Sequence, residues 1–246
     1  MNKNIIYLGD CLDIMGLIED RSVSLIFADL PYGTTACKWD CPISFASLWS
    51  HFLRIIKDDG NLVFTASQPF TSKLVMSNPG IFRYEFIWEK SQGTNPMVSK
   101  KQILKKHENV LVFYKKHGIY NPQMTEGKPY KGFSSDIATI GEVYGKGRSY
   151  HKENKGTRYP TSIVHFPREY GLHPTQKPLG LMEYIIKTFS NEGDIVMDPV
   201  CGSGTTLLAC RNLNRYYIGI EKEEDYYNIS VNRVNNKNNQ CCEDKQ

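Results

Sequence analysis

Two short motifs, far apart in the chain, carry residue types that suit the binding of a nucleotide. The first, Asp29-Leu30-Pro31-Tyr32, directly follows an apolar run at residues 24–28. It offers a carboxylate, main-chain carbonyls stiffened by a proline, and an aromatic face. These groups suit a planar ring that bears an exocyclic amine, because the acceptors take its two N–H bonds while the ring stacks. Taken alone, the same residues also fit an ordinary Pro-Tyr turn capped by an aspartate.

The second motif is a glycine turn, Asp198-Pro199-Val200-Cys201-Gly202-Ser203-Gly204-Thr205-Thr206, between an apolar run and an apolar helical segment. Glycines let the backbone turn tightly and approach a ligand closely, and the free N–H groups at a helix start suit an anionic group. Glu221 follows the next apolar run, where a carboxylate can accept hydrogen bonds from both ribose hydroxyls of an adenosine. The pair predicts an adenosine-containing cofactor. A nucleoside-triphosphate loop is excluded, because the chain lacks Gly-Lys-Ser/Thr.

Strands that alternate with helices must position both motifs. Short apolar runs predict buried parallel strands, and segments with apolar residues at helical spacing predict helices. The first helix is expected to end at Asp58-Asp59-Gly60. This order predicts an α/β fold with a mostly parallel sheet, helices on both faces, and both motifs at the carboxyl edge. The strands are expected at residues 5–8, 24–28, 62–64, 85–88, 110–113, 195–197 and 217–220, and the helices at 45–56, 179–189 and 205–213.

Further segments accompany the two motifs in a fixed order: Tyr7-Leu8-Gly9-Asp10-Cys11, then Trp88-Glu89-Lys90, His107-Glu108-Asn109 and His173-Pro174-Thr175-Gln176-Lys177-Pro178. With this set the chain resembles the amino-methyltransferases of DNA, in their permuted β class. The resemblance covers nearly the whole chain except residues 115–165. It implies the Rossmann-like fold of S-adenosylmethionine-dependent methyltransferases, with circularly permuted motif order.

The resemblance assigns roles to residues of both motifs. Asp29, the carbonyls of Leu30 and Pro31, and Tyr32 would form the catalytic site around a base rotated out of the duplex. The family usually has proline where this chain has Leu30, which keeps the carbonyl but leaves the turn less rigid. In the family, Asp at the first position goes with adenine N6 more often than Ser does, so adenine is preferred and cytosine N4 is the alternative. S-adenosylmethionine would be bound by Asp10, Asp198, Pro199, Gly202, Gly204, Thr205, Glu221, Thr175 and Lys177.

Three charged residues near these motifs have more than one interpretation. Lys177 is either a contact to the cofactor carboxylate or an ordinary surface lysine. His107 and Glu108 could be taken for an acid–base pair, but their position just before a buried strand favours a structural role outside the catalytic set.

An acceptor at Asp29 would favour a pyramidal amine nitrogen and stabilise the charge that develops on it.

The formal net charge of +4 hides an uneven distribution. Residues 98–168 contain 14 Lys and Arg against 5 Asp and Glu, a net charge of +9, which leaves −5 for the rest of the chain. Basic residues interleaved with tyrosines suit contacts to phosphates and bases, and a solvated flexible loop is the alternative. Beside the two motifs, the segment predicts recognition of double-stranded DNA, through Lys100, Lys101, Lys105, Lys106, Lys128, Lys131, Arg148 and Arg158.

Together these patterns predict one catalytic domain that carries an insertion. Residues 1–114 would form its catalytic half, 115–165 the target-recognition insertion, 166–234 the cofactor-binding half, and 235–246 a flexible tail. No apolar run approaches the roughly 18 residues of a membrane span. Seven cysteines without an export signal favour the reducing cytoplasm.

The cysteines are given neither a metal nor a catalytic role. Cys37 and Cys41 have no second close pair to complete the four ligands of a structural zinc. Methyl transfer to an amine needs no covalent nucleophile, so neither Cys37 nor Cys201 is placed in the catalytic set.

Several alternatives stay open on the sequence alone. The same scaffold could act on an RNA base or a protein amide, or the chain could be a DNA-binding protein that has lost transfer. Whether it works as a homodimer, and whether a cognate restriction endonuclease accompanies it, is left open by the sequence.

Overall fold

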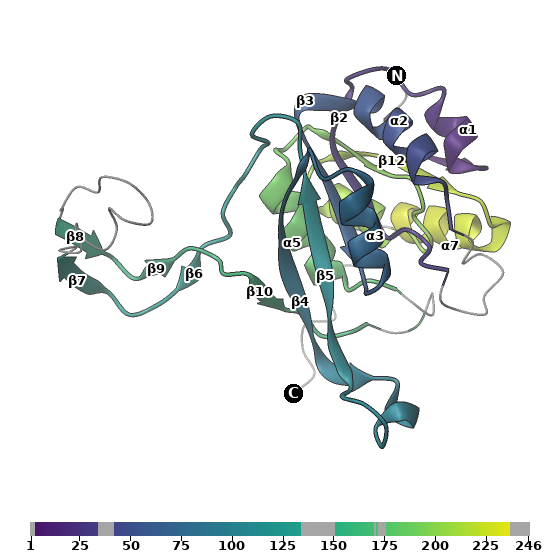
Figure 1. The fold of residues 1–246 in the computed structure, drawn as a ribbon. Helices are drawn as coiled ribbons and strands as arrows, with labels where there is room; N and C mark the ends of the chain where they lie inside the picture. The colour runs from purple at the N-terminus through teal and green to yellow at the C-terminus, as the bar shows by residue number, and fades with distance from the viewer. Residues whose placement is uncertain (1–2, 34–41, 134–150, 170, 172–175, 237–246) are drawn as a thin grey trace. The chain divides into compact units, whose positions relative to one another are not determined.

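The structure, a computed structural model, describes residues 3–33, 42–133, 151–169, 171 and 176–236. Its internal contacts divide the chain into two compact units. Unit 1 comprises Met1–Asn121 and Ser162–Gln246, and unit 2 is Pro122–Thr161. Figure 1 shows the helices and strands of both units, coloured from the N-terminus to the C-terminus.

Unit 1 is built on one sheet of eight strands. They are β1 (Ile5–Leu8), β2 (Val23–Ala28), β3 (Ile56–Ala66), β4 (Phe82–Thr94), β5 (Lys105–Phe113), β10 (Ile163–His165), β11 (Ile195–Asp198) and β12 (Tyr216–Glu221). Their order across the sheet is β1-β12-β11-β2-β3-β5-β4-β10. All neighbours are parallel except that β5 pairs antiparallel with both β3 and β4. Every residue of β2 is buried, as expected for a central strand covered on both faces.

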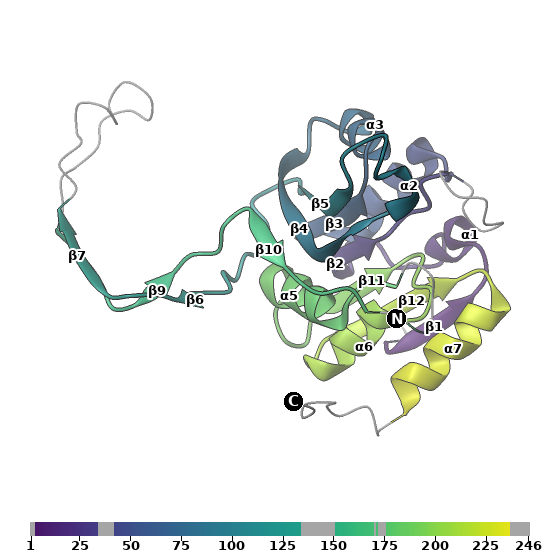
Figure 2. The ribbon, with the colours of Figure 1, turned by 90° about the horizontal axis from the view of Figure 1, so that it is seen from below.

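Helices cover both faces of this sheet (Figure 2). One face carries α1 (Cys11–Met15), α2 (Phe45–Ile55) and α3 (Phe70–Ser77), and the other carries α5 (Leu179–Phe189), α6 (Thr205–Asn212) and α7 (Glu224–Asn235). Because successive strand residues point to opposite faces, β2 contributes Ile26 to the first apolar core, and Leu25 and Phe27 to the second. Within the described ranges, no helix is long and apolar enough to cross a membrane.

These observations confirm the predicted α/β class, the mostly parallel sheet and the helices on both faces. The predicted strands and helices are all present, but two details were wrong. The run at residues 110–113 is not a parallel strand, because β4 and β5 form a hairpin whose two arms must be antiparallel. Asp58-Asp59-Gly60 does not end a helix, because α2 ends at Ile55 and β3 starts at Ile56.

The Asp58–Gly60 segment instead forms the irregular start of β3. The register between β2 and β3 shifts there, with Val23 opposite Ile56 but Leu25 opposite Asn61. A Cβ on Gly60 would lie 2.9 Å from the carbonyl oxygen of Ser24 in β2. The glycine therefore permits the close approach of two strands, and pairing between them overrides the local stop signal.

The described part of unit 2 contains two short antiparallel strand pairs. β6 (Thr125–Glu126) pairs with β9 (Thr157–Arg158), and β7 (Tyr130–Phe133) pairs with β8 (His151–Asn154). The unit lies inside the predicted insertion 115–165 but is shorter than it. The first residues of the predicted insertion belong to unit 1. Ile119 N donates to Asp59 O at 3.2 Å, and Asn121 N donates to Thr188 O at 2.8 Å. The predicted tail lies outside the described residues from 237 onward.

Candidate active site

The carboxyl edge of the sheet brings the two sequence motifs together. Asp198 is the last residue of β11, Glu221 is the last residue of β12, and Asp29 directly follows β2. β11 lies between β12 and β2 and is parallel to both. The three carboxylates therefore stand at the ends of three adjoining strands, where ligands bind in open α/β sheets.

Asp29 is held by donors from three parts of unit 1. Tyr32 Oη donates to its Oδ1 over 3.1 Å, and Thr65 Oγ1, near the end of β3, donates to the same atom. Lys177 Nζ donates to its Oδ2. The Asp29 side chain is still 24% exposed, so it can be reached from solvent. Since each carboxylate oxygen has two lone pairs, the carboxylate can accept from a further donor.

The next residues of this motif pack in different ways. The Leu30 side chain is buried in the apolar core that includes α2 and α3, which accounts for an aliphatic residue where the family has proline. Pro31 is half-buried. The Tyr32 ring stacks on Phe70, with 4.8 Å between ring centroids. Burial, reinforced by the charge of Asp29, raises the pKa of Tyr32 well above its usual value, so its phenol stays protonated and donates.

Asp198 is a buried carboxyl group at the start of the glycine turn. Only 3% of the residue is exposed, and its Oδ1 accepts from Val200 N at 3.1 Å. Burial raises the pKa of Asp198 to about 7, and the negative charges of Asp29 and Glu221 act in the same direction. Near neutral pH, both its charged and its neutral forms are therefore populated.

Glu221 connects the end of β12 to the glycine turn. Its Oε2 accepts from Gly202 N at 2.8 Å, while its Oε1 accepts from Lys222 N at 2.8 Å and from Glu223 N at 2.9 Å. Burial raises the pKa of this carboxyl as well, although these backbone donors oppose the shift. The hydrogen bonds fix the carboxylate at the same edge as Asp198.

The glycine turn has the left-handed backbone that the sequence suggests, with φ of +52° at Gly202 and +76° at Gly204. A Cβ on Gly204 would lie 2.9 Å from Ser230 Cβ in α7, so packing against this helix requires glycine. The close approach of a ligand to this glycine stays a prediction. Thr205 begins α6, and its Oγ1 accepts from Arg233 of α7 at 2.7 Å. Pro199 is buried beneath the turn's start.

Asp10 lies beyond the end of β1, next to the Glu221 strand. β1 is parallel to β12, with Leu8 opposite Glu221. Asp10 caps α1 by accepting from Leu12 N at 2.9 Å, and its Oδ2 lies 3.2 Å from Lys222 Nζ. It thus stands at the same carboxyl edge, and its predicted role near adenine stays a prediction.

Lys177 lies on the Asp29 side of the edge and not on the surface. It is 9% exposed and contacts Asp29 Oδ2 and, at 3.5 Å, Glu108 Oε2. Glu108 in turn pairs with Lys90 of β4. Sequence reasoning left Glu108 outside the site and did not consider Lys90 for it. Their occurrence in the family-like segments 88–90 and 107–109 was the signal that could have found them.

The predicted DNA-binding residues fall in two regions. Lys100 and Lys101 are exposed at the tip of the β4–β5 hairpin, beyond the 3₁₀ turn η1 (Pro96–Val98). At the start of β5, next to the hairpin loop, Lys106 pairs with Glu89 at 3.0 Å, and Lys105 is turned inward to donate to Ser67 Oγ.

In unit 2 the basic residues lie along the strand pairs. Lys128 is exposed, and Lys131 lies 3.4 Å from Glu153. The Arg158 guanidinium stacks 4.7 Å from the centroid of the Tyr130 ring. Arg148, like Thr175 and the Cys37 and Cys41 pair, lies outside the described residues. Within the part of the chain that is described, no three His, Cys, Asp or Glu side chains are grouped to hold a metal ion.

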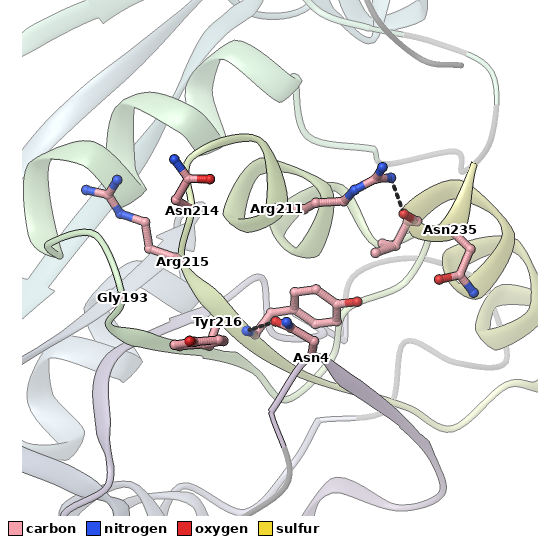
Figure 3. A pocket seen from close by; sticks show the side chains of 9 residues that line it. Asn4, Gly193, Arg211, Asn214, Arg215, Tyr216 and Asn235 are labelled. Atoms are coloured by element: carbon pink, nitrogen blue, oxygen red, sulfur yellow. Dashed lines mark hydrogen bonds between the residues drawn. The ribbon is translucent and has the colours of Figure 1, made fainter. Parts of the chain in front are cut away.

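A separate pocket of about 540 Å³ lies at the opposite, amino edge of the sheet (Figure 3). Its lining includes Asn4, Arg211, Arg215 and Tyr216. Both guanidiniums are already bound to main-chain carbonyls: Arg215 donates to Leu213 O and Ser190 O, and Arg211 to Val234 O and Asn236 O. The arginines of this pocket therefore hold the backbone in place. The clustered carboxylates lie at the carboxyl edge and not here.

Comparison with known proteins shows to which family the chain belongs. A family model for N6/N4 methyltransferases, described as DNA methylase, matches residues 23–232. The chain belongs to this family. Among curated relatives of this DNA methylase, the type II methyltransferase M.HindIII of Haemophilus influenzae is 24% identical, with 98% of each chain covered. The DNA adenine methyltransferase YhdJ of Escherichia coli is 30% identical, over 94% of this chain and 82% of the relative.

Solved structures of similar proteins support the fold of the DNA methylase. A complex of M1.HpyAVI with SAM is 26% identical, covers 94% of this chain and 98% of its own, and gives a TM-score of 0.64. The cytosine-N4-specific PvuII DNA methyltransferase is 17% identical, with 97% and 88% covered and a TM-score of 0.65. At that identity, the second likeness shows the fold alone.

Proposed function

We propose that this DNA methylase transfers the methyl group of S-adenosylmethionine to the exocyclic N6 of an adenine rotated out of duplex DNA. The observation that carries the proposal is the juxtaposition of Asp29 with Asp198 and Glu221 at adjoining strand ends. An accessible acceptor for an amine thus lies beside carboxylates that suit a cofactor. Methyl transfer between two bound molecules requires this adjacency, because donor and acceptor atoms must be brought into contact.

The residues on the cofactor side fit S-adenosylmethionine by their chemistry. Its ribose hydroxyls and its ammonium group are donors, and Glu221, Asp198 and Asp10 are acceptors at one edge. The start of α6 at Thr205 presents backbone N–H groups that suit the methionine carboxylate. When bound, the cofactor supplies a methyl carbon activated by a positively charged sulfur. We assign Pro199, Gly202 and Gly204 to the shape of this turn.

On the target side, the chain's own residues orient and polarise the amine. Asp29 and the carbonyl of Leu30 accept its two hydrogens, which favours a pyramidal nitrogen whose lone pair points at the methyl carbon. With the cofactor bound, the nitrogen would form its bond to the methyl carbon as the bond from that carbon to sulfur breaks and leaves its electron pair on sulfur, and one amine proton would pass to Asp29 or to water. Preorganised acceptors of this kind are typically worth ~3–4 kcal/mol in the transition state. Pro31 and Tyr32 shape the turn around the base.

Adenine is preferred on two grounds. The first motif residue is Asp29, the type associated with adenine N6 in the family that the chain resembles. The relative YhdJ is described as a DNA adenine methyltransferase. Cytosine N4 is the second candidate, since the PvuII enzyme shares the fold and is described as specific for that amine.

We assign DNA contacts to the basic residues of two regions. Unit 2, within the predicted insertion 115–165, presents Lys128, Lys131 and Arg158 on an open ribbon. The hairpin tip presents Lys100 and Lys101. The flanking segments 1–114 and 166–234 would then serve as the catalytic and cofactor-binding halves of one domain. Phosphate contacts of this kind hold the duplex without selecting a sequence.

The direct test is nucleoside analysis of DNA incubated with the protein and S-adenosylmethionine labelled in its methyl group. The expected product is N6-methyladenine, with none formed by an Asp29→Ala variant. Label in N4-methylcytosine would support the second candidate. Label in RNA or protein but not in DNA would contradict the proposal, and so would tight duplex binding without any methyl transfer.

A further inference from the structure

A row of charges of alternating sign runs along the carboxyl edge from Asp29 toward β4. Lys177 Nζ donates to Asp29 Oδ2 and lies 3.5 Å from Glu108 Oε2. Glu108 Oε1 accepts from Lys90 Nζ, which also lies 4.8 Å from the centroid of the Trp88 ring. The side chains of Lys177, Glu108 and Lys90 are only 9%, 13% and 10% exposed. The accessible carboxylate of Asp29 is therefore the outer end of a buried ionic chain.

We propose that Lys177 is a positioning residue for methyl transfer: anchored by Glu108 and Lys90, its ammonium fixes the Asp29 carboxylate in the ionised, amine-accepting orientation. The inference rests on the proposed function, because it assigns a role at the same site. It departs from both sequence interpretations of Lys177, which placed it on the cofactor carboxylate or on the open surface.

The energetics of burial show why Lys177 needs both carboxylates. An ammonium removed from water carries a penalty of several kcal/mol unless it is well paired. Burial lowers the pKa of Lys177, but Asp29 and Glu108 outweigh this effect and the net shift is upward. For Glu108 burial acts in the opposite direction, and the ammonium groups of Lys177 and Lys90 outweigh it to lower the pKa of that carboxyl. The two central members of the row, Lys177 and Glu108, therefore stabilise each other in their charged forms.

The row has a consequence for the reaction. A base amine is neutral, so the target brings no positive charge that could keep a carboxylate ionised in a partly buried site. Lys177 supplies this charge before the base arrives. Because Lys177 holds Oδ2 while Tyr32 and Thr65 hold Oδ1, rotation of the carboxylate is restricted as well. Such preorganisation is what makes an acceptor effective in a transition state.

The experiment compares Lys177→Met, which keeps much of the apolar stem, with Lys177→Arg, which keeps the charge. Single-turnover methyl transfer to duplex DNA is measured at saturating cofactor, and cofactor affinity is measured separately by calorimetry. We expect Lys177→Met to lower the rate constant by roughly 100-fold or more, the size seen when one preorganised group is removed. The cofactor Kd should stay within about threefold by the same argument, and Lys177→Arg should recover part of the rate.

Rescue by charge separates positioning from a merely structural role. Lys177→Arg keeps a positive charge that can pair with Asp29, so it should be faster than Lys177→Met in single-turnover methyl transfer. Packing damage alone would slow both variants alike. A Lys177→Arg variant as slow as Lys177→Met, with unchanged cofactor affinity, would therefore overturn the positioning role.

Lys57→Met is the matched control. Lys57 also pairs with a carboxylate, Asp194, at 3.6 Å, but lies at the start of β3 on the opposite edge of the sheet. The rate constant of the Lys57→Met variant should equal that of the unaltered chain. If Lys177→Met fails to fold, Glu108→Gln and Lys177→Arg serve for the same measurements, with Glu108→Gln expected to lower the rate constant without weakening cofactor binding.

The outcomes distinguish this inference from the proposed function. An unaltered chain that methylates no DNA contradicts the proposed function itself. An active chain whose Lys177→Met variant keeps the rate constant of the unaltered chain overturns only the positioning role. A Lys177→Met variant that loses cofactor affinity more than about tenfold, with an unchanged chemical step, overturns it too and returns Lys177 to the cofactor.

Discussion

The two halves of the carboxyl edge treat buried carboxyl groups in opposite ways. On the cofactor half, burial raises the pKa of Asp198 to about 7 and also raises that of Glu221. On the target half, burial acts on Glu108 in the same direction, but Lys177 and Lys90 reverse the result and lower its pKa. The difference between the halves is therefore the presence of a built-in counter-ion, and not the degree of burial.

This difference matches the charges of the two ligands that we assign to the halves. S-adenosylmethionine carries an ammonium and a sulfonium, so a carboxyl left without a lysine can be ionised by the ligand that it binds. The amine of a base is neutral and cannot do this. A site for it must contain its own positive charge, and the row at Asp29 provides one.

The largest expected effect is on the target half. Asp29→Ala should lower single-turnover methyl transfer by about 1,000-fold or more, because it removes the acceptor of the reacting amine. Cofactor affinity, measured by calorimetry, should change by less than about threefold, since the removed group contacts the other ligand. A comparable loss in cofactor affinity would break the division of the edge into two halves.

Asp198→Asn should produce the reverse pattern. The cofactor Kd is expected to rise by about 10- to 100-fold through loss of a buried charge partner, while the rate constant at saturating cofactor falls by much less. Binding in the unaltered chain should also weaken as pH falls below about 7, where Asp198 becomes protonated, and this pH dependence should vanish in the variant. Calorimetry at pH 6 and pH 8 tests both statements.

A smaller effect is expected on the stability of the cofactor-free protein. The folded pKa of Asp198, about 7, exceeds its ordinary value of 3.8, so the folded state binds more protons over this interval. Stability is therefore lost as pH rises from about 4 to about 7. Asp198→Asn should raise Tm by several degrees at pH 8 and by less at pH 5. Asp58→Asn, at an exposed carboxylate paired with Lys116, is the control and should show no such gain.

The smallest effect concerns exposed lysines, in contrast to the buried ones beside Asp29. Replacing Lys100 and Lys101 by Ala should reduce the slope of log affinity against log salt by about 2, one for each lost phosphate contact. Lys116→Ala, at the opposite edge of the sheet, should leave the slope unchanged. An unchanged slope in the double variant would show that the hairpin tip does not contact DNA.

The strands and the carboxylates that follow them could be predicted from sequence, because a central parallel strand must be apolar on both faces. Each of these apolar runs ends in a carboxylate residue: Asp29, Asp198 or Glu221. In this fold class the carboxyl ends of parallel strands lie at one edge of the sheet, so the three residues are expected together there. The start of β3 could not be predicted in this way. Pairing with β2 stabilises a strand through Asp58-Asp59-Gly60, although the local sequence favours a helix stop.

The buried row at Asp29 was also beyond sequence reasoning. Lys177 and Glu108 are of residue types usually found on the surface, and their pairing depends on how Lys177, just before α5, lies against Asp29 after β2 and Glu108 near the start of β5. The role of Gly204 was similarly hidden, because its neighbour Ser230 belongs to α7. In each case the contact that explains the residue joins segments far apart in the sequence, and patterns of neighbouring residues do not reveal such contacts.

The order of strands in the sheet has a consequence for synthesis of the chain. Among the described strands β1 pairs only with β12, and β2 needs β11 on one side, so both strands wait for partners that are synthesised much later than they are. The part of the sheet that joins the two motifs therefore cannot assemble until residue 221 has left the ribosome. A nascent chain that already carries Asp29 has no adjoining cofactor half, and methylating activity can begin only once synthesis has passed β12.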